Sequence, residues 1–222
     1  MSMNYKNLLI LSAIATTTLS SADLIQNGSF EKTPHALTQS ANGGKWDYFV
    51  GSISGWYSDT TYKGEKKSDL AFIEVGQAQV YGVTGQSGKN VLELDSNKNS
   101  KVSQNIDDIK KSDYYTVTFA AAQRAGTSVA TNAFEVLWDD KVIATIDPAS
   151  TKLKDYSFTF KGGKEEGKLS FLATGQSDSY GGIIDNVRMK DRGCNAPVPE
   201  PASMLALGGG LLGLLRRRRA NA

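Results

Sequence analysis

The middle of the chain alternates apolar and polar residues with a period of two, the pattern of β-strands with one buried face. Residues 114–119 read Y-Y-T-V-T-F and residues 156–160 read Y-S-F-T-F, which puts the three aromatic residues of the second segment on one face. Residues 134–138 and 142–146 flank the short turn Asp139-Asp140-Lys141. We therefore predict strands in all four segments and a hairpin between the last two.

Further short apolar stretches predict more strands, separated by turns of Gly, Asn, Asp and Ser. These strands are expected at residues 24–30, 69–75, 91–95, 100–106, 168–173 and 182–189, with a loop at 174–181. Residues 35–68 are polar and rich in aromatic residues, and we expect loops there that lie over the sheets. No amphipathic helix pattern appears between the strands. Short strands about ten residues apart indicate an all-β, two-sheet sandwich.

The N-terminus has the pattern of a secretory signal peptide. Lys6 precedes the apolar run 8–15, and small residues follow, ending in Ser20-Ser21-Ala22. Cleavage after Ala22 would make Asp23 the first mature residue. We therefore divide the chain into a signal peptide (1–22), a β-sandwich domain (23–195) and a C-terminal segment (196–222).

The C-terminal segment contains an apolar run, residues 202–215, that ends in a basic block. At about 1.5 Å per residue, a helix of these 14 residues spans roughly 21 Å, whereas the hydrocarbon core of a bilayer is about 30 Å thick. Three consecutive glycines, 208–210, weaken such a helix by roughly 1 kcal/mol each. The run therefore predicts transient insertion into the inner membrane rather than permanent anchoring. The arginines are expected to stay on the cytoplasmic side, which puts the domain on the other side.

In order, this segment consists of a proline motif, a glycine-interrupted apolar helix and a basic cluster, and in this it resembles a PEP-CTERM sorting signal. The residues that carry the resemblance are Val198, Pro199, Glu200, Pro201, Arg216, Arg217, Arg218 and Arg219. The resemblance covers residues 198–219. It implies processing by an exosortase-type enzyme and a destination at the cell surface or in an extracellular, biofilm-type matrix.

Charge and composition exclude several functions for the domain between the two signals. The chain has a net charge of +2, but Lys6 contributes +1 and the C-terminal segment +3, so residues 23–195 carry about −2. This balance argues against nucleic acid as a partner. With one histidine, His35, and one cysteine, Cys194, the chain lacks the usual ligands of a zinc site. Cys194 is expected to be a free thiol near the end of the domain, and the alternative is a thiol that forms an intermolecular disulfide.

Four motifs occur in a fixed order along the domain, and together they resemble galactose-binding-like jelly rolls and DUF642-like cell-wall domains. They are N-G-S-F-E at 27–31, Gly55-Trp56, G-K-N-V-L-E-L at 88–94 and G-I-I-D-N-V-R at 182–188. The resemblance covers residues 24–190. It implies a two-sheet jelly roll whose first and last strands lie close together.

Asp185 is a candidate metal ligand. On a regular strand it shares a face with apolar residues at 183, 187 and 189, and an unpaired buried carboxylate is costly. Members of the resembled families often hold a structural Ca²⁺ between the opening N-G-S-F-E segment and the closing strand. This implies Glu31 and Asp185 as ligands, completed by backbone carbonyls. The alternatives are a carboxylate that accepts hydrogen bonds from neighbouring backbone amides, or an ion pair of the kind Arg188 would make.

Glycan binding would use exposed aromatic side chains as stacking platforms and polar side chains to hold hydroxyl groups. The candidates are Trp46, Tyr48, Tyr57, Tyr62, Tyr81, Arg124 and Tyr180. Gln123 is a further polar partner, while Trp56 and Trp138 are expected in the core. The same aromatic residues could instead pack the core or its rim.

We find no catalytic motif, since His35 is alone and the acidic pairs at 107–108, 139–140 and 165–166 all lie in predicted turns. The sequence therefore predicts an exported, non-catalytic protein that binds extracellular polysaccharide. The alternatives are a structural matrix protein without specific glycan binding, and a secreted hydrolase.

Overall fold

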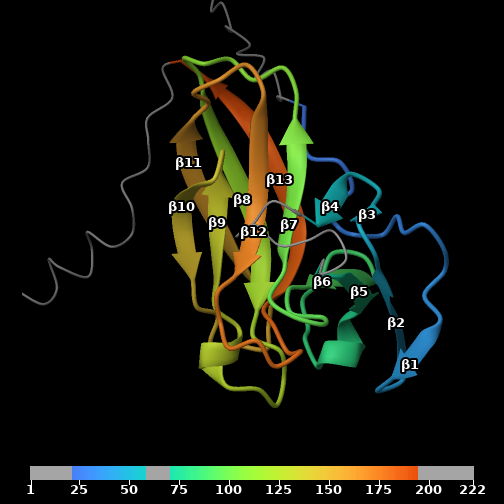
Figure 1. Cartoon of the computed structure of the whole chain (residues 1–222). Helices are drawn as coiled ribbons and strands as arrows, with labels where there is room; N and C mark the ends of the chain where they lie inside the picture. Colours follow the sequence, from blue (N-terminus) through green and yellow to red (C-terminus); the bar gives the residue numbers. More distant parts are fainter. Residues whose placement is uncertain (1–21, 59–70, 195–222) are drawn as a thin grey trace, which may run out of the picture.

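Two antiparallel sheets packed face to face make up this protein, as the computed structural model shows for residues 22–58 and 71–194 (Figure 1). The seven-stranded sheet has, in spatial order, β1 (Gln39–Ala41), β2 (Gly44–Phe49), β5 (Ile73–Gln77), β6 (Asn90–Glu93), β13 (Ile183–Gly193), β8 (Tyr114–Ala122) and β11 (Lys154–Lys161). The six-stranded sheet has β10 (Lys141–Ile146), β9 (Phe134–Trp138), β12 (Gly167–Ala173), β7 (Lys101–Ile106), β4 (Trp56–Ser58) and β3 (Ser52–Ile53). The predicted all-β jelly-roll sandwich is confirmed.

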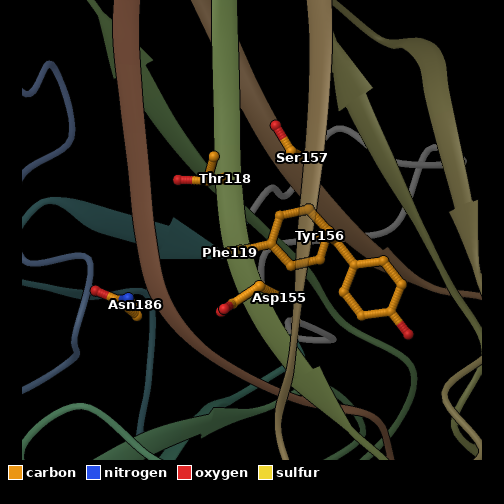
Figure 2. A pocket seen from close by; sticks show the side chains of 6 residues that line it. All are labelled: Thr118, Phe119, Asp155, Tyr156, Ser157 and Asn186. Carbon is orange, nitrogen blue, oxygen red and sulfur yellow. The ribbon is translucent and has the colours of Figure 1, made fainter. Parts of the chain in front are cut away.

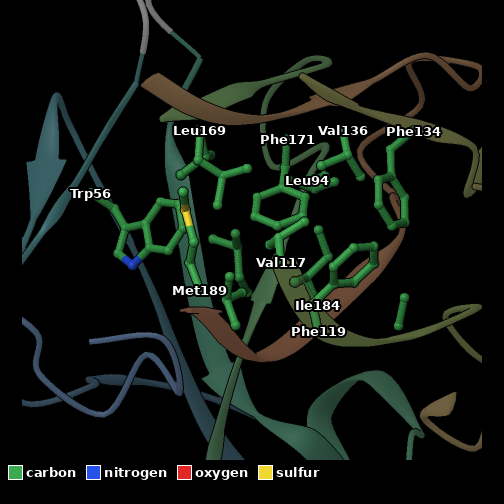
Figure 3. Packing of buried hydrophobic residues seen from close by; sticks show 14 of the residues in the cluster. Trp56, Leu94, Val117, Phe119, Phe134, Val136, Leu169, Phe171, Ile184 and Met189 are labelled. Atoms are coloured by element: carbon green, nitrogen blue, oxygen red, sulfur yellow. The ribbon is translucent and has the colours of Figure 1, made fainter. Parts of the chain in front are cut away.

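The main hydrophobic core lies between the two sheets and is rich in aromatic rings (Figure 3). Phe171 on β12 is fully buried, and its ring meets the Phe119 ring of β8 edge-on, with 5.3 Å between the centroids. Trp56 and Trp138 are both buried in this core, as the sequence predicts. Edge-to-face aromatic pairs of this kind add about 0.5–1.5 kcal/mol to the effect of burial alone.

A second, smaller apolar cluster covers part of the outer face of the seven-stranded sheet. The short 3-10 helix η3 (Ala78–Tyr81) lies there, and its buried residues pack with Val91 of β6 and Ile183 of β13. A further 3-10 helix, η4 (Val129–Thr131), lies in the loop after β8. Side chains on the covered part of this outer face are therefore buried even though they point away from the main core.

The predicted hairpin is confirmed. Asp139 and Asp140 connect β9 to β10 and have φ values of 50° and 62°, and Trp138 pairs with Lys141. Two central residues with positive φ make a type I′ turn, whose twist matches that of the flanking strands. The other strands predicted after residue 69 all form, with bounds that differ by a few residues.

Two predictions for the N-terminal part of the domain are wrong. Residues 24–30 form turns rather than a strand, because Asn27 and Phe30 have φ values of 50° and 55°, which no regular strand contains. The segment nevertheless lies against β13, where the Val187 N–H donates to the carbonyl of Gly28 at 2.8 Å. In the predicted loop region 35–68, the described residues form β1 to β4, which are short and separated by glycine turns.

A β-bulge in β13 overturns the predicted alternation around Asp185. The pairing with β8 shifts between Asp185 and Arg188, and Asn186 has a φ of 51°. Because a bulge adds one residue, side chains before and after it change faces. Asp185 therefore pairs with Ala120 of the second cluster, whereas Val187 points into the main core.

Candidate binding site

Arg124, just beyond the end of β8, lies at the centre of a group of tyrosines and acids at one end of the sandwich. Its guanidinium lies over the Tyr81 ring at 5.0 Å and over the Tyr180 ring at 4.5 Å from the centroids. Its Nη1 atom is 3.7 Å from Oε1 of Glu93. The Arg124 backbone N–H donates to the Asn132 side chain at 2.9 Å, which fixes the start of the side chain. The sequence candidates Tyr81, Arg124 and Tyr180 are thus brought together.

Two buried carboxylates hold the loop that carries Tyr180. Asp95 accepts hydrogen bonds from the backbone N–H groups of Asp178 and Ser179 at 2.7 and 2.9 Å, and from the Ser177 hydroxyl at 3.1 Å. Glu93 accepts from the Gly181 N–H. Tyr180 therefore projects from a loop whose backbone is fixed on both sides of it.

Glu93 on β6 and Glu74 on β5 are register partners on neighbouring strands. Both side chains are buried beneath the second apolar cluster. Burial, and secondarily the nearby Glu74 carboxyl, raise the pKa of Glu93 from its ordinary value of 4.5 to about 8, against the opposing effect of Arg124. Burial also raises the pKa of Glu74, which accepts the Tyr81 hydroxyl hydrogen bond at 3.1 Å. Two like charges this close disfavour double ionisation.

A hollow of about 430 Å³ opens beside Tyr180. It is lined by Ala125, Gly126, Thr127, Ser128, Thr131, Gln176, Asp178 and Tyr180. The volume lies at the lower end of the range for small-ligand sites. Tyr180 is 47% exposed, and hydroxyl, amide and carboxylate groups share the lining with it. The arrangement can stack one apolar face of a small polar molecule and hydrogen-bond its edges.

The remaining aromatic candidates lie elsewhere. Trp46 and Tyr48 are on β2, where the Tyr48 ring stacks on Phe72 at 5.0 Å and stays 44% exposed. Tyr57, on β4, donates its hydroxyl hydrogen bond to Asn105 at 2.8 Å. Tyr62 lies outside the described residues. Tyr81 is buried, so its ring supports Arg124 and leaves no face for a sugar, which corrects its proposed role as a platform.

The candidate calcium ligands Glu31 and Asp185 both face the loop 87–90. Oε1 of Glu31 accepts from the N–H groups of Lys89 and Asn90 at 2.7 and 2.9 Å, and Asp185 accepts from Ser87 at 2.5 Å. Burial, and secondarily the charge of Glu31, raise the pKa of Asp185 to about 6. Two hard carboxylates near one another suit Ca²⁺. Among residues 22–58 and 71–194, no group of three or more His, Cys, Asp or Glu side chains could hold a metal ion.

The acids Glu74, Glu93 and Asp95 were not singled out by the sequence. The only available signal was the alternation in V-L-E-L-D, residues 91–95, which places two acids on the face opposite two leucines. On its own that pattern is typical of a strand with a solvent-exposed face. Cys194 is exposed.

Comparison with known proteins places this geometry in context. The chain is 34% identical over 114 residues to a multifunctional-autoprocessing repeats-in-toxin of Vibrio vulnificus. The matched segment covers 50% of this chain but 2% of the toxin. A similar protein of Vibrio cholerae is 33% identical over 111 residues, again over 2% of its length. The chain thus spans only a small fraction of the curated relatives it matches.

Among solved structures, a Stig cyclase, Fisc, from Fischerella sp. TAU superposes with a TM-score of 0.54 at 17% identity, covering 79% of this chain and all of that one. A CBM35 from Paenibacillus barcinonensis gives a TM-score of 0.39 at 12% identity, over 66% of this chain and 98% of that one. The first of these likenesses supports the sandwich fold.

Two family models match the chain. The PEP-CTERM protein-sorting motif covers residues 197–219, so the predicted sorting signal is confirmed, although it lies outside the described residues, as do residues 1–21. No helix in 22–58 or 71–194 is long and apolar enough to cross a membrane. The second model is DUF642, a protein of unknown function, and because it matches residues 23–190, most of the chain, this protein belongs to the DUF642 family.

Proposed function

We propose that this protein is exported, sorted to the cell surface and binds extracellular polysaccharide without catalysis, using the hollow beside Tyr180. The observation that carries the proposal is an exposed tyrosine ring fixed at the rim of a polar hollow by Arg124 and two buried carboxylates. Sugar rings present apolar C–H faces that pack on aromatic rings, and their hydroxyls pair with side chains such as Thr127 and Gln176. A site that is rigid before binding loses less entropy when the ligand binds.

The sorting motif supports the destination. A PEP-CTERM signal at 197–219 is typical of proteins processed by an exosortase-type enzyme, and we propose that enzyme as a processing partner, with the apolar run 202–215 inserted transiently in the inner membrane. Such a protein reaches the compartment that contains extracellular polysaccharide and matrix.

The position of the acids supports a non-catalytic role. Glycoside hydrolysis needs two carboxyls that flank the scissile bond. Glu74 and Glu93, which have raised pKa values, are both buried and line no part of the hollow. Asp178 is the one acid in its lining, and it accepts hydrogen bonds from the Thr131 hydroxyl and the Tyr180 N–H.

A glycan array probed with the full chain tests the proposal, followed by affinity measurements on the best ligand. We expect Tyr180→Ala to weaken binding about tenfold or more, since loss of a central aromatic contact usually costs over 1 kcal/mol. Tyr48→Ala is the matched control, because Tyr48 is similarly exposed (44%) but lies on β2. Both variants should keep the wild-type melting temperature.

Flat responses across plant, algal and bacterial polysaccharides would refute glycan binding. That result would favour the alternative, a structural matrix protein that acts through display or self-association. Equal losses in the two tyrosine variants would show that the hollow beside Tyr180 is not the binding site.

A further inference from the structure

The outer face of β13 carries a row of cations. Three residues of this strand are exposed: Arg188, Lys190 and Arg192. By contrast, Val187, just before Arg188, and Met189, between Arg188 and Lys190, are buried in the main core. Alternate residues of a strand point to the same face about 6.7 Å apart, which puts Arg188 and Lys190 side by side on the outer face. The pairing of β13 shifts again between Asp191 and Gly193, and Arg192, which lies at this second shift, lines the same hollow as the other two cations. The bulge at Asn186 determines which residues of β13 after it face outward and which face the core.

The floor beside this row consists of hydroxyl side chains. Thr118 and Thr116 of β8 are the register partners of Arg188 and Lys190, and Ser157 of β11 is the partner of Thr118. Together with Arg192 these side chains line a hollow of about 370 Å³. We call it the β13 trough.

A second hollow, of about 330 Å³, adjoins the trough and shares Thr118 and Ser157 with it. Figure 2 shows these two hydroxyls on neighbouring strands with Asp155 and Asn186, whereas the Tyr156 ring extends from the other side of β11. The outer face of β13, β8 and β11 is thus hollowed over an extended length, and its lining combines hydroxyl, amide and charged groups.

Of the three cations of the trough, Arg188 alone is in an ion pair within the described residues. Arg188 is 3.5 Å from an Asp23 carboxylate oxygen. Within residues 22–58 and 71–194, no ion pair involves Lys190 or Arg192. The domain as a whole has a net charge of about −2. The row therefore concentrates positive charge on one face of a domain that is mildly acidic overall. Fixed cations on one surface attract and orient anionic ligands.

We propose that the β13 trough binds acidic polysaccharide, a polymer whose sugars carry carboxylate or sulfate groups. Arg and Lys form charge-assisted hydrogen bonds with such groups, and the threonine and serine hydroxyls match the sugar hydroxyls between them. A linear polymer with repeated anionic groups engages all three cations at once, which a single small anion cannot do. This site is separate from the hollow beside Tyr180 and does not depend on it.

The test measures binding of the full chain to alginate and dextran sulfate, with neutral dextran and duplex DNA as comparison polymers. We expect binding to both acidic polysaccharides that weakens as NaCl rises from 50 to 500 mM. The triple variant R188Q/K190Q/R192Q should lose about tenfold or more in affinity, because three favourable charge pairs are removed. The matched control K32Q/K141Q/K152Q removes the same charge from exposed lysines elsewhere and should change affinity less than twofold.

Tyr180→Ala should leave alginate binding unchanged, which separates this proposal from the proposed function. Equal losses in the two triple variants would show a general charge effect and overturn the assignment to β13. Absence of binding to both acidic polymers, equal binding of neutral dextran, or tighter binding of DNA would overturn acidic polysaccharide as the ligand. Melting temperatures of both variants within a few degrees of the wild type show that the fold is intact.

Discussion

The raised pKa of Glu93 predicts that the domain loses stability as the pH rises towards 8. In the folded protein this carboxyl keeps its proton up to a pKa of about 8, whereas the unfolded chain releases it near 4.5. Between these values the unfolded state binds fewer protons, so stability is fully present below pH 4.5 and is lost as the pH rises through 8. The raised pKa of Glu74 acts in the same direction.

The magnitude follows from the width of the window. About 3.5 pH units separate the two pKa values, and at 1.36 kcal/mol per unit the largest possible loss is about 5 kcal/mol. A measurement between pH 5 and 7.5 covers about 2.5 of these units, so we expect the free energy of unfolding to fall by about 3 kcal/mol. Urea unfolding followed by tryptophan fluorescence measures it, since Trp56 and Trp138 are buried.

The variant Glu93→Gln isolates the effect, because an amide carries no ionisable proton but keeps an oxygen that accepts the Gly181 N–H. We expect most of the pH dependence between 5 and 7.5 to disappear in this variant. Glu166→Gln, at an exposed position, should leave the dependence as in the wild type. The reasoning is refuted if Glu93→Gln and the wild type have parallel pH profiles, or if wild-type stability rises over this range.

Three further predictions concern packing and metal binding. Phe171→Ala should lower the free energy of unfolding by about 3–5 kcal/mol in urea titrations, whereas Val142→Ala, at an exposed position, should change it by less than about 0.5 kcal/mol. Gly28→Ala places a Cβ 1.9 Å from the carbonyl oxygen of Val187 and should lower the melting temperature by several degrees; an unchanged value would mean that the opening segment does not dock on β13. We propose structural Ca²⁺ at Glu31 and Asp185, so added calcium should raise the melting temperature and excess chelator should lower it, and a value insensitive to both contradicts it.

Local patterns were sufficient for the strands from residue 73 onwards. The hairpin at 134–146 could be located because its strands alternate and Asp139-Asp140 suits a turn with positive φ. By contrast, residues 24–30 have a strand-like apolar content, but Asn27 and Phe30 have positive φ, and the segment docks on β13 through hydrogen bonds of Leu24 and Gly28 rather than as a paired strand. The strands between 39 and 58 were missed because they are short and separated by glycines, which gives the alternation no room to appear.

The candidate site could be predicted only in part, because its residues are far apart in the sequence. Tyr81, Arg124 and Tyr180 were candidates one by one, yet nothing local indicates that one guanidinium lies over both rings. The burial of Glu93 depends on η3, which covers the outer face of the sheet through tertiary contacts. The cation row on β13 depends on a bulge that shifts the alternation by one residue, and regular periodicity does not predict bulges.

The way Asp95 holds the loop 177–181 has a consequence for how the proposed glycan site could change its ligand. Two of the three hydrogen bonds that reach Asp95 come from backbone N–H groups, and Glu93 accepts a third backbone N–H of the loop, that of Gly181. Backbone amides are the same for every residue except proline. Position 180 can therefore accept many side chains while the loop keeps its shape, so ligand preference can change by single substitutions on a fixed support.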